Sequence, residues 1–379
     1  MISKHELKDL VSSRRGSENF VLSVYLNVDQ RQAANLNRGF EAALRDLLRS
    51  LQNGVEPEAE RQRLRANSAE VLQFASLYQP SGKCLVLFSE ASSNFLWERS
   101  LQVPIETQAF WDCHPILRPL LEARDEFERY GVILTDRAHA RLFTVVMGEI
   151  EENREALAQG DVRRFDATSQ DQLRSQMHLQ RRSNEHARWH QKNVAQMMDR
   201  LLDQQKFDRL VLAGPPEAAS ELKSLLSERL RQRLVGTLSL PIHAVEAEIL
   251  KAAVALQESV ERMEEREKVE RLLTLAAKNH QAVVGVEATL EAVCGGRARE
   301  LIYAEGFRRQ GGECMECGIL LADAKGLCAG CRRQLRPVGN LLEPLVRRVF
   351  DEGGRVEQLK AEAAAMMQSA EGVGAFLRF

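Results

Sequence analysis

Four cysteines in the last quarter of the chain are the clearest group of residues that could bind a metal ion. Cys314, Cys317, Cys328 and Cys331 form two C-x2-C pairs, separated by ten residues, in the run GGECMECGILLADAKGLCAGC. Each pair brings two thiolates within reach of one ion, and the loop between them lets four sulfurs form a tetrahedron. We therefore predict a closed structural Zn²⁺ site, which stabilises the fold and has no open position for catalysis. The alternative is four unmetallated thiols packed in a hairpin.

The other three cysteines, Cys84, Cys113 and Cys294, are isolated in the sequence. In a reducing compartment cysteines are free thiols or metal ligands more often than disulfides. We expect these three to be buried as small apolar side chains.

A second candidate site is the basic, amide-rich stretch 173–194, which reads LRSQMHLQRRSNEHARWHQKNV and contains one acid and no glycine. Its cations could neutralise phosphates, and its amides could hydrogen-bond to RNA. The candidate RNA-binding cations are Arg174, Arg181, Arg182, Arg188 and Lys192. Trp189 could stack on a base, but we favour a place in the core for it. For the whole stretch, the alternative is a solvated helix face.

Histidines in the same stretch could form a metal pair, because His186 and His190 lie one helical turn apart and His178 precedes them by two turns. The sequence is not H-E-x-x-H, however, and no carboxylate is placed as a third ligand. We favour a solvated polar face for these histidines. The chain also lacks a P-loop and the motifs G-x-S-x-G and G-x-G-x-x-G, so we expect no nucleotide hydrolysis on a P-loop.

The bulk composition indicates a globular protein of several domains. The chain has 379 residues, of which 44% are hydrophobic and 28% are charged, and this length suits two or three domains. A net charge of −2 argues against a wholly basic nucleic-acid coat but allows a local basic patch. No apolar run is long enough to span a membrane, and MISKHELKDL has no signal-peptide core. We expect a cytoplasmic protein.

The hydrophobic pattern predicts alternating strands and helices, which is an α/β fold. We expect a first domain over 1–128, with a strand at 20–26, helices at 34–51, 58–77 and 115–127, and strands in KCLVLFS, NFLWERSLQV and ETQAFW.

The second domain, 129–270, begins with a predicted hairpin, YGVILTD and ARLFTVVMG. A helix follows with Val194, Met197, Met198, Leu201 and Leu202 on one face, and then come the strand FDRLVLAGP, a helix from Glu217 and the strand VGTLSLP. A long charged helix over 244–277, with ion pairs along its solvated side, leads into the third domain, 271–379. That domain contains the cysteine minidomain at about 311–336 and ends in the predicted strand GVGAFLRF.

Taken together, these features resemble the archaeal and eukaryotic class-one peptide-chain release factors and Pelota, in the divergent form found in bacteria. The local pieces that support this resemblance are VLSVYLNVD, GVILTDRAHARLF, FDRLVLAGP, VGVEATLEAV and NLLEPLVRRVF. The resemblance implies an RNase H-like middle domain and a C-terminal domain like the kink-turn-binding ribosomal proteins, with a zinc-ribbon-type insertion. It also implies binding to rRNA and tRNA in the ribosomal A site, in rescue or hibernation, and a translational GTPase as partner.

In release factors, the loop before the basic helix contains Gly-Gly-Gln, whose glutamine positions a water against the peptidyl-tRNA ester. Here the loop reads LRSQMHLQRR, so Gln176 lies nearest to the matching position and Gln180 is a second candidate. Leu173 and Arg174 stand where the glycines would be, and the decoding motif Asn-Ile-Lys-Ser is also absent. Binding without catalysis is therefore the main hypothesis. In the alternative, peptidyl-tRNA hydrolysis, Arg181 and Arg182 would hold phosphates of the acceptor stem.

A third hypothesis is an RNA-processing nuclease on the RNase H-like domain. Such an enzyme needs clustered acids that bind two metal ions. Asp136, at the end of the first strand of the middle domain, is a candidate ligand, but no partner carboxylates stand at the ends of the neighbouring strands.

Overall fold

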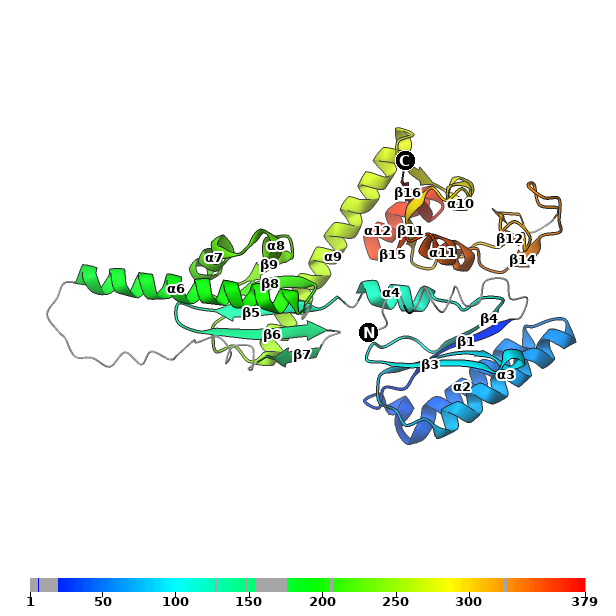
Figure 1. Cartoon of the computed structure of the whole chain (residues 1–379), viewed down its shortest axis with the longest axis horizontal. Helices are drawn as coiled ribbons and strands as arrows, with labels where there is room; N and C mark the ends of the chain where they lie inside the picture. Colours follow the sequence, from blue (N-terminus) through cyan, green and yellow to red (C-terminus); the bar gives the residue numbers. More distant parts are fainter. Residues whose placement is uncertain are drawn as a thin grey trace. The chain divides into compact units, whose positions relative to one another are not determined.

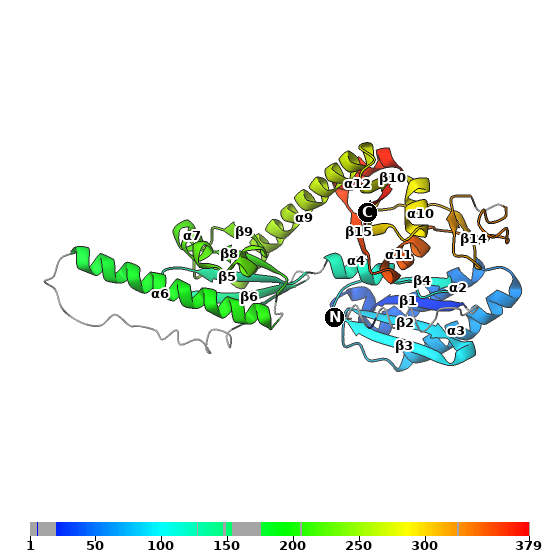
Figure 2. The same cartoon turned by 45° about the horizontal axis from the view of Figure 1, so that its top comes forward.

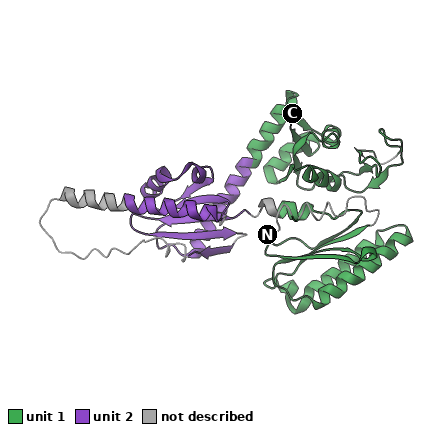
Figure 3. Cartoon of the chain, in the orientation of Figure 1, with its two compact units in different colours: residues 1–126, 265–379 green, residues 127–264 purple. Residues whose placement is uncertain are grey.

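The computed structural model describes residue 6 and residues 20–126, 128–146, 149–153, 176–204, 207–323 and 326–378, with the backbone alone at 124–126 and 176–187. These residues group into two compact units, one made of 1–126 and 265–379 and the other of 127–264 (Figure 3). Helices pack against several sheets in a mixed α/β fold, as predicted. The division into three domains stays a prediction.

The N-terminal part of the first unit is an antiparallel sheet in the order β3-β2-β1-β4 (Figure 1). Its elements are β1 (Val21–Asn27), η1 (Ala33–Arg38), α2 (Gly39–Asn53), α3 (Glu58–Leu77), β2 (Cys84–Glu90), η2 (Ala91–Ser93), β3 (Phe95–Leu101), β4 (Gln108–Asp112) and α4 (Arg118–Glu126). Leu22, Val24 and Leu26 alternate along β1 and belong to the core formed with α2 and α3. On the opposite face, the Tyr25 hydroxyl donates to the carbonyl oxygen of Ile116.

The helix predicted over 34–51 is divided in the structure, whereas the helix predicted over 58–77 is confirmed as α3. The break occurs where Asn37 and Arg38 adopt left-handed backbone angles, with φ of 51° and 63°. The guanidinium of Arg38 donates hydrogen bonds to carbonyl oxygens at the C-terminal end of α3. The last carbonyls of a helix lack the usual helical partners, so the break allows Arg38 to cap the neighbouring helix.

The C-terminal part of the first unit contains a four-stranded sheet in the order β10-β16-β11-β15, in which only β11 and β15 are parallel, and the three-stranded sheet β13-β12-β14. Its elements are β10 (Ala282–Val284), α10 (Val286–Cys294), β11 (Ala298–Ala304), β12 (Gly311–Glu313), β13 (Leu320–Leu321), β14 (Arg336–Val338), α11 (Leu342–Asp351), β15 (Arg355–Leu359), α12 (Ala361–Met367), η3 (Gln368–Ala370) and β16 (Val373–Leu377). The predicted last strand is β16, which lies inside the larger sheet. The sequence analysis did not predict β15 and α12.

The second unit is built on a five-stranded sheet in the order β7-β6-β5-β8-β9. Its elements are β5 (Tyr130–Thr135), β6 (Ala140–Val146), β7 (Glu149–Glu152), α6 (Gln176–Asp203), β8 (Arg209–Ala213), α7 (Pro216–Leu225), α8 (Glu228–Arg231), β9 (Leu234–Leu238) and the first part of α9 (Glu246–Ala277). The predicted hairpin is confirmed as β5 and β6, which are antiparallel, whereas β8 and β9 run parallel to β5. The sequence analysis missed β7 and the short helix α8.

Helices cover both faces of this sheet, and α6 runs along one of them (Figure 2). Ile133, Leu210 and Leu212 point to the face that packs against α6, α7 and α8. The residues that alternate with them point to the other face, where Ile249 and Ala253 of α9 belong to the same core. Because both faces are buried, the central strands are almost uniformly apolar, and this is why they were recognisable in the sequence.

Candidate nucleic-acid interface and metal centre

The long helix α6 contains the part of the basic stretch that the structure describes. Val194, Met198 and Leu201 are buried against the sheet, and the predicted apolar face of this helix is confirmed. These residues follow the helical period, so one stripe of the helix is anchored and the opposite stripe faces solvent.

The solvent-facing stripe of α6 is cationic. Arg188, Lys192, Gln196 and Arg200 recur every four residues and are exposed. Among the described residues, none forms an ion pair with the three cations. Uncompensated cations on one helix face favour contact with phosphates, although they can also be simply solvated.

Two of our expectations for this helix were wrong. Trp189, expected in the core, is 51% exposed, and His190, expected on a solvated face, is only 5% exposed. Burial lowers the pKa of His190 below its usual value, against an opposing effect of the His139 backbone. The anchored stripe thus begins at His190, one residue after the tryptophan.

Gln191 joins α6 to the end of β5. Its side-chain nitrogen donates to the carbonyl oxygen of Asp136 at 2.6 Å and to the hydroxyl of Thr135 at 3.2 Å. Gln191 is fully buried, so these bonds are shielded from water. They fix the helix against the turn between β5 and β6.

Asp136 has a structural role in that turn. Its carboxylate accepts hydrogen bonds from the backbone N–H groups of Ala138 at 2.7 Å and His139 at 2.6 Å. Partial burial would raise the pKa of this carboxyl, but the two N–H donors outweigh it, and the pKa lies below its usual value. Among the described residues, only the four cysteines lie close enough together to hold a metal ion, so the nuclease hypothesis gains no support from Asp136.

Several predicted site residues cannot be placed as side chains. Gln176 is the first residue of α6, and Gln180, Arg181 and Arg182 follow in its first turns, but their side chains lie outside the described residues. The same holds for His178 and His186, and Arg174 lies wholly outside the described residues. Of the five predicted RNA-binding cations, Arg188 and Lys192 can be described.

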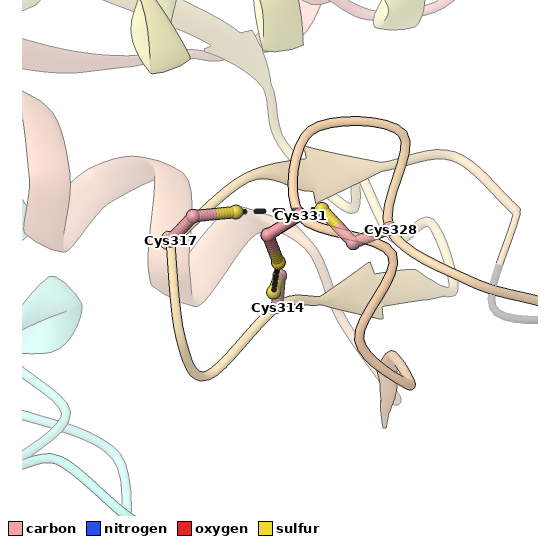
Figure 4. Close-up of side chains that lie close together, drawn as sticks. All are labelled: Cys314, Cys317, Cys328 and Cys331. Carbon is pink, nitrogen blue, oxygen red and sulfur yellow. Dashed lines mark hydrogen bonds between the residues drawn. The ribbon is translucent and has the colours of Figure 1, made fainter.

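The four predicted metal ligands come together at one point of the minidomain (Figure 4). Cys314 Sγ lies 3.3 Å from Cys331 Sγ, and Cys317 Sγ lies 3.3 Å from Cys328 Sγ. All four sulfurs lie within 4.8 Å of one another. The predicted grouping is therefore present, and it joins the two C-x2-C loops across the ten residues between them.

The two cysteine loops have the same backbone hydrogen-bond pattern. The N–H of Cys314 donates to Ile319 at 2.9 Å, and the N–H of Cys328 donates to Arg333 at 2.7 Å, five residues on in each case. The residue after the second cysteine of each loop also donates a backbone hydrogen bond. The N–H of Gly318 donates to the carbonyl oxygen of Cys314, and the N–H of Arg332 donates to that of Cys328. Both residues have positive φ, 72° for Gly318 and 58° for Arg332.

Backbone N–H groups also point at the sulfurs. Those of Cys317 and Glu316 lower the pKa of the Cys314 thiol to about 6, and that of Cys331 is the main cause of a lowered pKa at Cys328, whereas hydrogen bonds within the cluster raise the pKa of Cys317 and Cys331. Such N–H donors stabilise thiolates, the form that binds metal ions. Four sulfurs that lie close together and accept hydrogen bonds from N–H groups suit a metal ion that prefers thiolate ligands in a tetrahedral arrangement.

Charged residues that the sequence analysis did not single out connect this minidomain to the rest of the unit. Glu313, which precedes Cys314, accepts hydrogen bonds from Arg336 and from Arg347 of α11, each at 2.6 Å. Arg336 also lies 3.4 Å from Asp112, at the end of β4. The partners are far apart in sequence, so no local pattern could have indicated them.

A second polar cluster lies between α4, α11 and β11 in the same unit. Arg118 donates to Glu343 at 2.7 Å and to Glu122 at 2.9 Å, and the hydroxyl of Tyr303 donates to Glu122. Burial is the main reason that the pKa of Tyr303 is raised above its usual value. This cluster links the N-terminal and C-terminal parts of the first unit.

The isolated cysteines lie as expected in two of three cases. Cys84 and Cys113 are buried, and burial raises the pKa of each thiol to about 12. Cys294 is half-buried, and its sulfur accepts a hydrogen bond from the N–H of Leu320, in β13, at 3.2 Å. The expectation of full burial was wrong for Cys294, because this thiol contacts the edge of the minidomain.

The Gly-Gly pair before the cysteines is explained by packing. A Cβ atom at Gly311 would lie 2.4 Å from the carbonyl oxygen of Leu321, so no larger residue fits there. The pair therefore lets β12 approach its neighbours closely.

Comparisons with known proteins match this architecture. Residues 115–258 match the family described as bacterial archaeo-eukaryotic release factor family 10. The peptide chain release factor subunit 1 of Methanocaldococcus jannaschii is 25% identical over 319 residues, which cover 80% of this chain and 74% of that protein. The uncharacterized protein YocB of Bacillus subtilis is 24% identical over 233 residues, covering 56% of this chain and 85% of that protein.

Among the solved structures that the comparison matched is the Pelota protein of Archaeoglobus fulgidus, at 17% identity and a TM-score of 0.32, with 80% of this chain and 81% of that chain covered. In the described part of the chain, no helix is both long and apolar enough to cross a membrane. The sequence matches place residues 115–258 in the bacterial archaeo-eukaryotic release factor family 10, and over most of its length the chain is similar to the release factor subunit of M. jannaschii.

Proposed function

We propose that this protein is a ribosome-associated translation factor that occupies the A site of stalled or idle ribosomes, in rescue or hibernation. The observation that carries the proposal is the exposed row of cations on α6, Arg188, Lys192 and Arg200, which have no ionic partner among the described residues. A row of this kind suits the phosphates of rRNA or tRNA. The match of residues 115–258 to a release factor family, and the similarity to a release factor subunit, support the ribosome as the source of the bound RNA and a translational GTPase as partner.

The proposal includes the domain types that the resemblance implies. The order β7-β6-β5-β8-β9, with β6 antiparallel to β5 and with β8 and β9 parallel to it, supports an RNase H-like middle domain. For the C-terminal part, a four-stranded sheet with helices α10, α11 and α12 around it agrees with the proposed kink-turn-binding-protein type.

We propose that Cys314, Cys317, Cys328 and Cys331 hold one Zn²⁺ ion. Two loops with matching hydrogen bonds and sulfurs within 4.8 Å of one another support a zinc-ribbon-type minidomain. A shell of four thiolates leaves no position for water or substrate, so the ion would stabilise the minidomain and take no part in a reaction.

Peptidyl-tRNA hydrolysis is a second candidate function. The observation that favours it is that Gln176 is the first described residue of α6, the same helix that exposes the cations Arg188 and Lys192. Gln176 could orient a water toward the ester, while Arg181 and Arg182 hold phosphates of the acceptor stem. Purified protein that releases no peptide from stalled complexes would exclude this function, and a Gln176→Ala variant that releases peptide as fast as the parent protein would exclude the role of Gln176.

The binding proposal is tested by co-sedimentation of the full chain with 70S ribosomes over a series of salt concentrations. Contact through several phosphates predicts binding that weakens steeply and linearly on a log-log plot. Absence of the protein from the ribosomal pellet at low salt would contradict the proposal.

A further inference from the structure

Residues 189–191 of α6 reverse the usual distribution of polar and apolar side chains. Trp189 is 51% exposed, whereas His190 is 5% exposed and Gln191 is fully buried. Tryptophan gains more from burial than either neighbour, and buried polar groups are costly unless they are hydrogen-bonded. The helix therefore exposes a large apolar ring to solvent and buries the two polar side chains that follow it.

The reversal costs stability. His190 Nε2 and Gln191 Oε1 are buried and have no hydrogen-bond partner among the described residues. Leaving a buried polar atom unpaired is unfavourable. A departure from local preference of this kind is expected at sites that serve a function.

The hydrogen bonds of Gln191 and the burial of His190 fix the rotation of the helix. Gln191 Nε2 donates to the carbonyl oxygen of Asp136 and to the hydroxyl of Thr135, and His190 is only 5% exposed. These contacts hold one side of the helix against the β5–β6 turn. Because successive helical residues are about 100° apart, Trp189 must then point away from the sheet.

Cations flank the exposed ring. Arg188 is its neighbour in the chain and Lys192 lies three residues on, and both are exposed without an ionic partner in the described part of the chain. Residues three or four apart lie side by side on a helix. An aromatic ring with cations beside it matches a nucleobase with the phosphates next to it.

We infer that Trp189 is a stacking platform for an unpaired nucleobase, so that the RNA on this face of α6 is single-stranded where it meets the ring. In a duplex the faces of the bases are covered by their neighbours, and only an unstacked base can lie on an aromatic side chain. This inference rests on the proposed function, because it specifies the kind of RNA that the same helix contacts. Gln191 and His190 act as positioning residues that hold the ring in solvent.

The test compares two RNA probes that carry the same number of phosphates, a fluorescently labelled oligouridine and a blunt-ended RNA duplex. Each is titrated with the full-length chain and with three variants, Trp189→Ala, Trp189→Phe and Arg188→Ala/Lys192→Ala. We expect Trp189→Ala to weaken oligouridine binding roughly tenfold, the effect of losing one stacked base, and to leave its salt dependence unchanged. Trp189→Phe keeps a stacking ring and should retain most of the affinity.

The outcomes separate this inference from the proposed function. The stacking inference is wrong if Trp189→Ala weakens binding of the duplex as much as binding of the oligouridine, or if it weakens the binding of neither probe. The same conclusion follows if the variant loses ribosome binding but binds oligouridine normally, because Trp189 would then contact a ribosomal protein. A different result would contradict the proposed function. This result is that the Arg188→Ala/Lys192→Ala variant binds ribosomes with the affinity and the salt dependence of the parent protein. Equal thermal unfolding of all variants confirms that they fold.

Discussion

The side-chain amide of Gln191 donates a 2.6 Å hydrogen bond to the carbonyl oxygen of Asp136, joining the basic helix α6 to the end of strand β5. Strand β5 lies at the centre of its sheet, so this bond ties the candidate RNA-binding helix to the rigid core of its unit. A rigid support reduces the entropy that is lost when the helix binds RNA.

Replacing Gln191 with leucine should destabilise the protein. The change removes the shorter of the two side-chain hydrogen bonds to the carbonyl oxygen of Asp136 and leaves only that from the Thr135 hydroxyl at 3.2 Å, at a cost of about 1–3 kcal/mol. Urea unfolding followed by circular dichroism would measure it. Gln196→Leu, at an exposed position of the same helix, is the matched control and should change the free energy of unfolding by less than about 0.5 kcal/mol. Equal effects of the two substitutions would contradict the structural role of Gln191.

The four cysteines should bind one zinc ion per chain. Elemental analysis of the purified protein measures the metal, and Cys314→Ser or Cys328→Ser should remove most of it, because a hydroxyl replaces a thiolate ligand. Cys84→Ser is the control, since this buried thiol belongs to another sheet. A protein without metal, or zinc retained by Cys314→Ser, would contradict the site.

Glu313 should stabilise the attachment of the minidomain. Its carboxylate is 6% exposed and lies between Arg336 and Arg347. Removing one partner of a buried ion pair leaves an uncompensated charge, so Glu313→Gln should lower the free energy of unfolding by roughly 3 kcal/mol. Glu316→Gln changes the same type of side chain at an exposed position of the first cysteine loop and should have little effect. No difference between the two would exclude a stabilising role for the Glu313 cluster.

Stability should fall when the pH is lowered from about 7 to 5, and His114 should contribute. Burial, together with Arg347, lowers the pKa of His114 to about 4 in the folded protein, whereas an unfolded histidine titrates near its usual value of about 6.5. Between these two values the unfolded chain binds more protons than the folded one, so acidification favours unfolding. The contribution is roughly 2 kcal/mol over this range. His114→Asn should lose that part of the pH dependence in urea unfolding, and an unchanged profile would contradict the assignment.

Arg332 should tolerate glycine. It has a φ of 58°, and in the matching position of the first loop the residue is Gly318. A left-handed backbone costs a residue with a side chain about 1 kcal/mol, so Arg332→Gly should preserve zinc binding and leave the thermal midpoint equal or higher. Gly318→Arg is the reciprocal change and should lower that midpoint. A loss of zinc in Arg332→Gly would show that the arginine side chain itself supports the loop.

The parts of the fold that the sequence predicted are those in which local chemistry decides the structure. The helix 58–77 and the strand FDRLVLAGP have uninterrupted patterns, and the spacing of Cys314 to Cys331 permits one compact site. The reversal at 189–191 was missed because it depends on hydrogen bonds to a distant turn, which an apolar period does not record. Long-range ion pairs such as Arg336 with Asp112 also have no local pattern.

The central claim, that the exposed cations of α6 contact ribosomal RNA, is tested most directly by the salt dependence of ribosome binding in a triple variant. Arg188→Ala/Lys192→Ala/Arg200→Ala should reduce the log-log slope by about 2 to 3, since each phosphate contact contributes about 0.9. The control replaces Lys223, Arg231 and Lys251, which are exposed cations on other helices of the same unit, and should keep the parent slope. A triple variant that binds 70S ribosomes with the slope and affinity of the parent protein would contradict the claim.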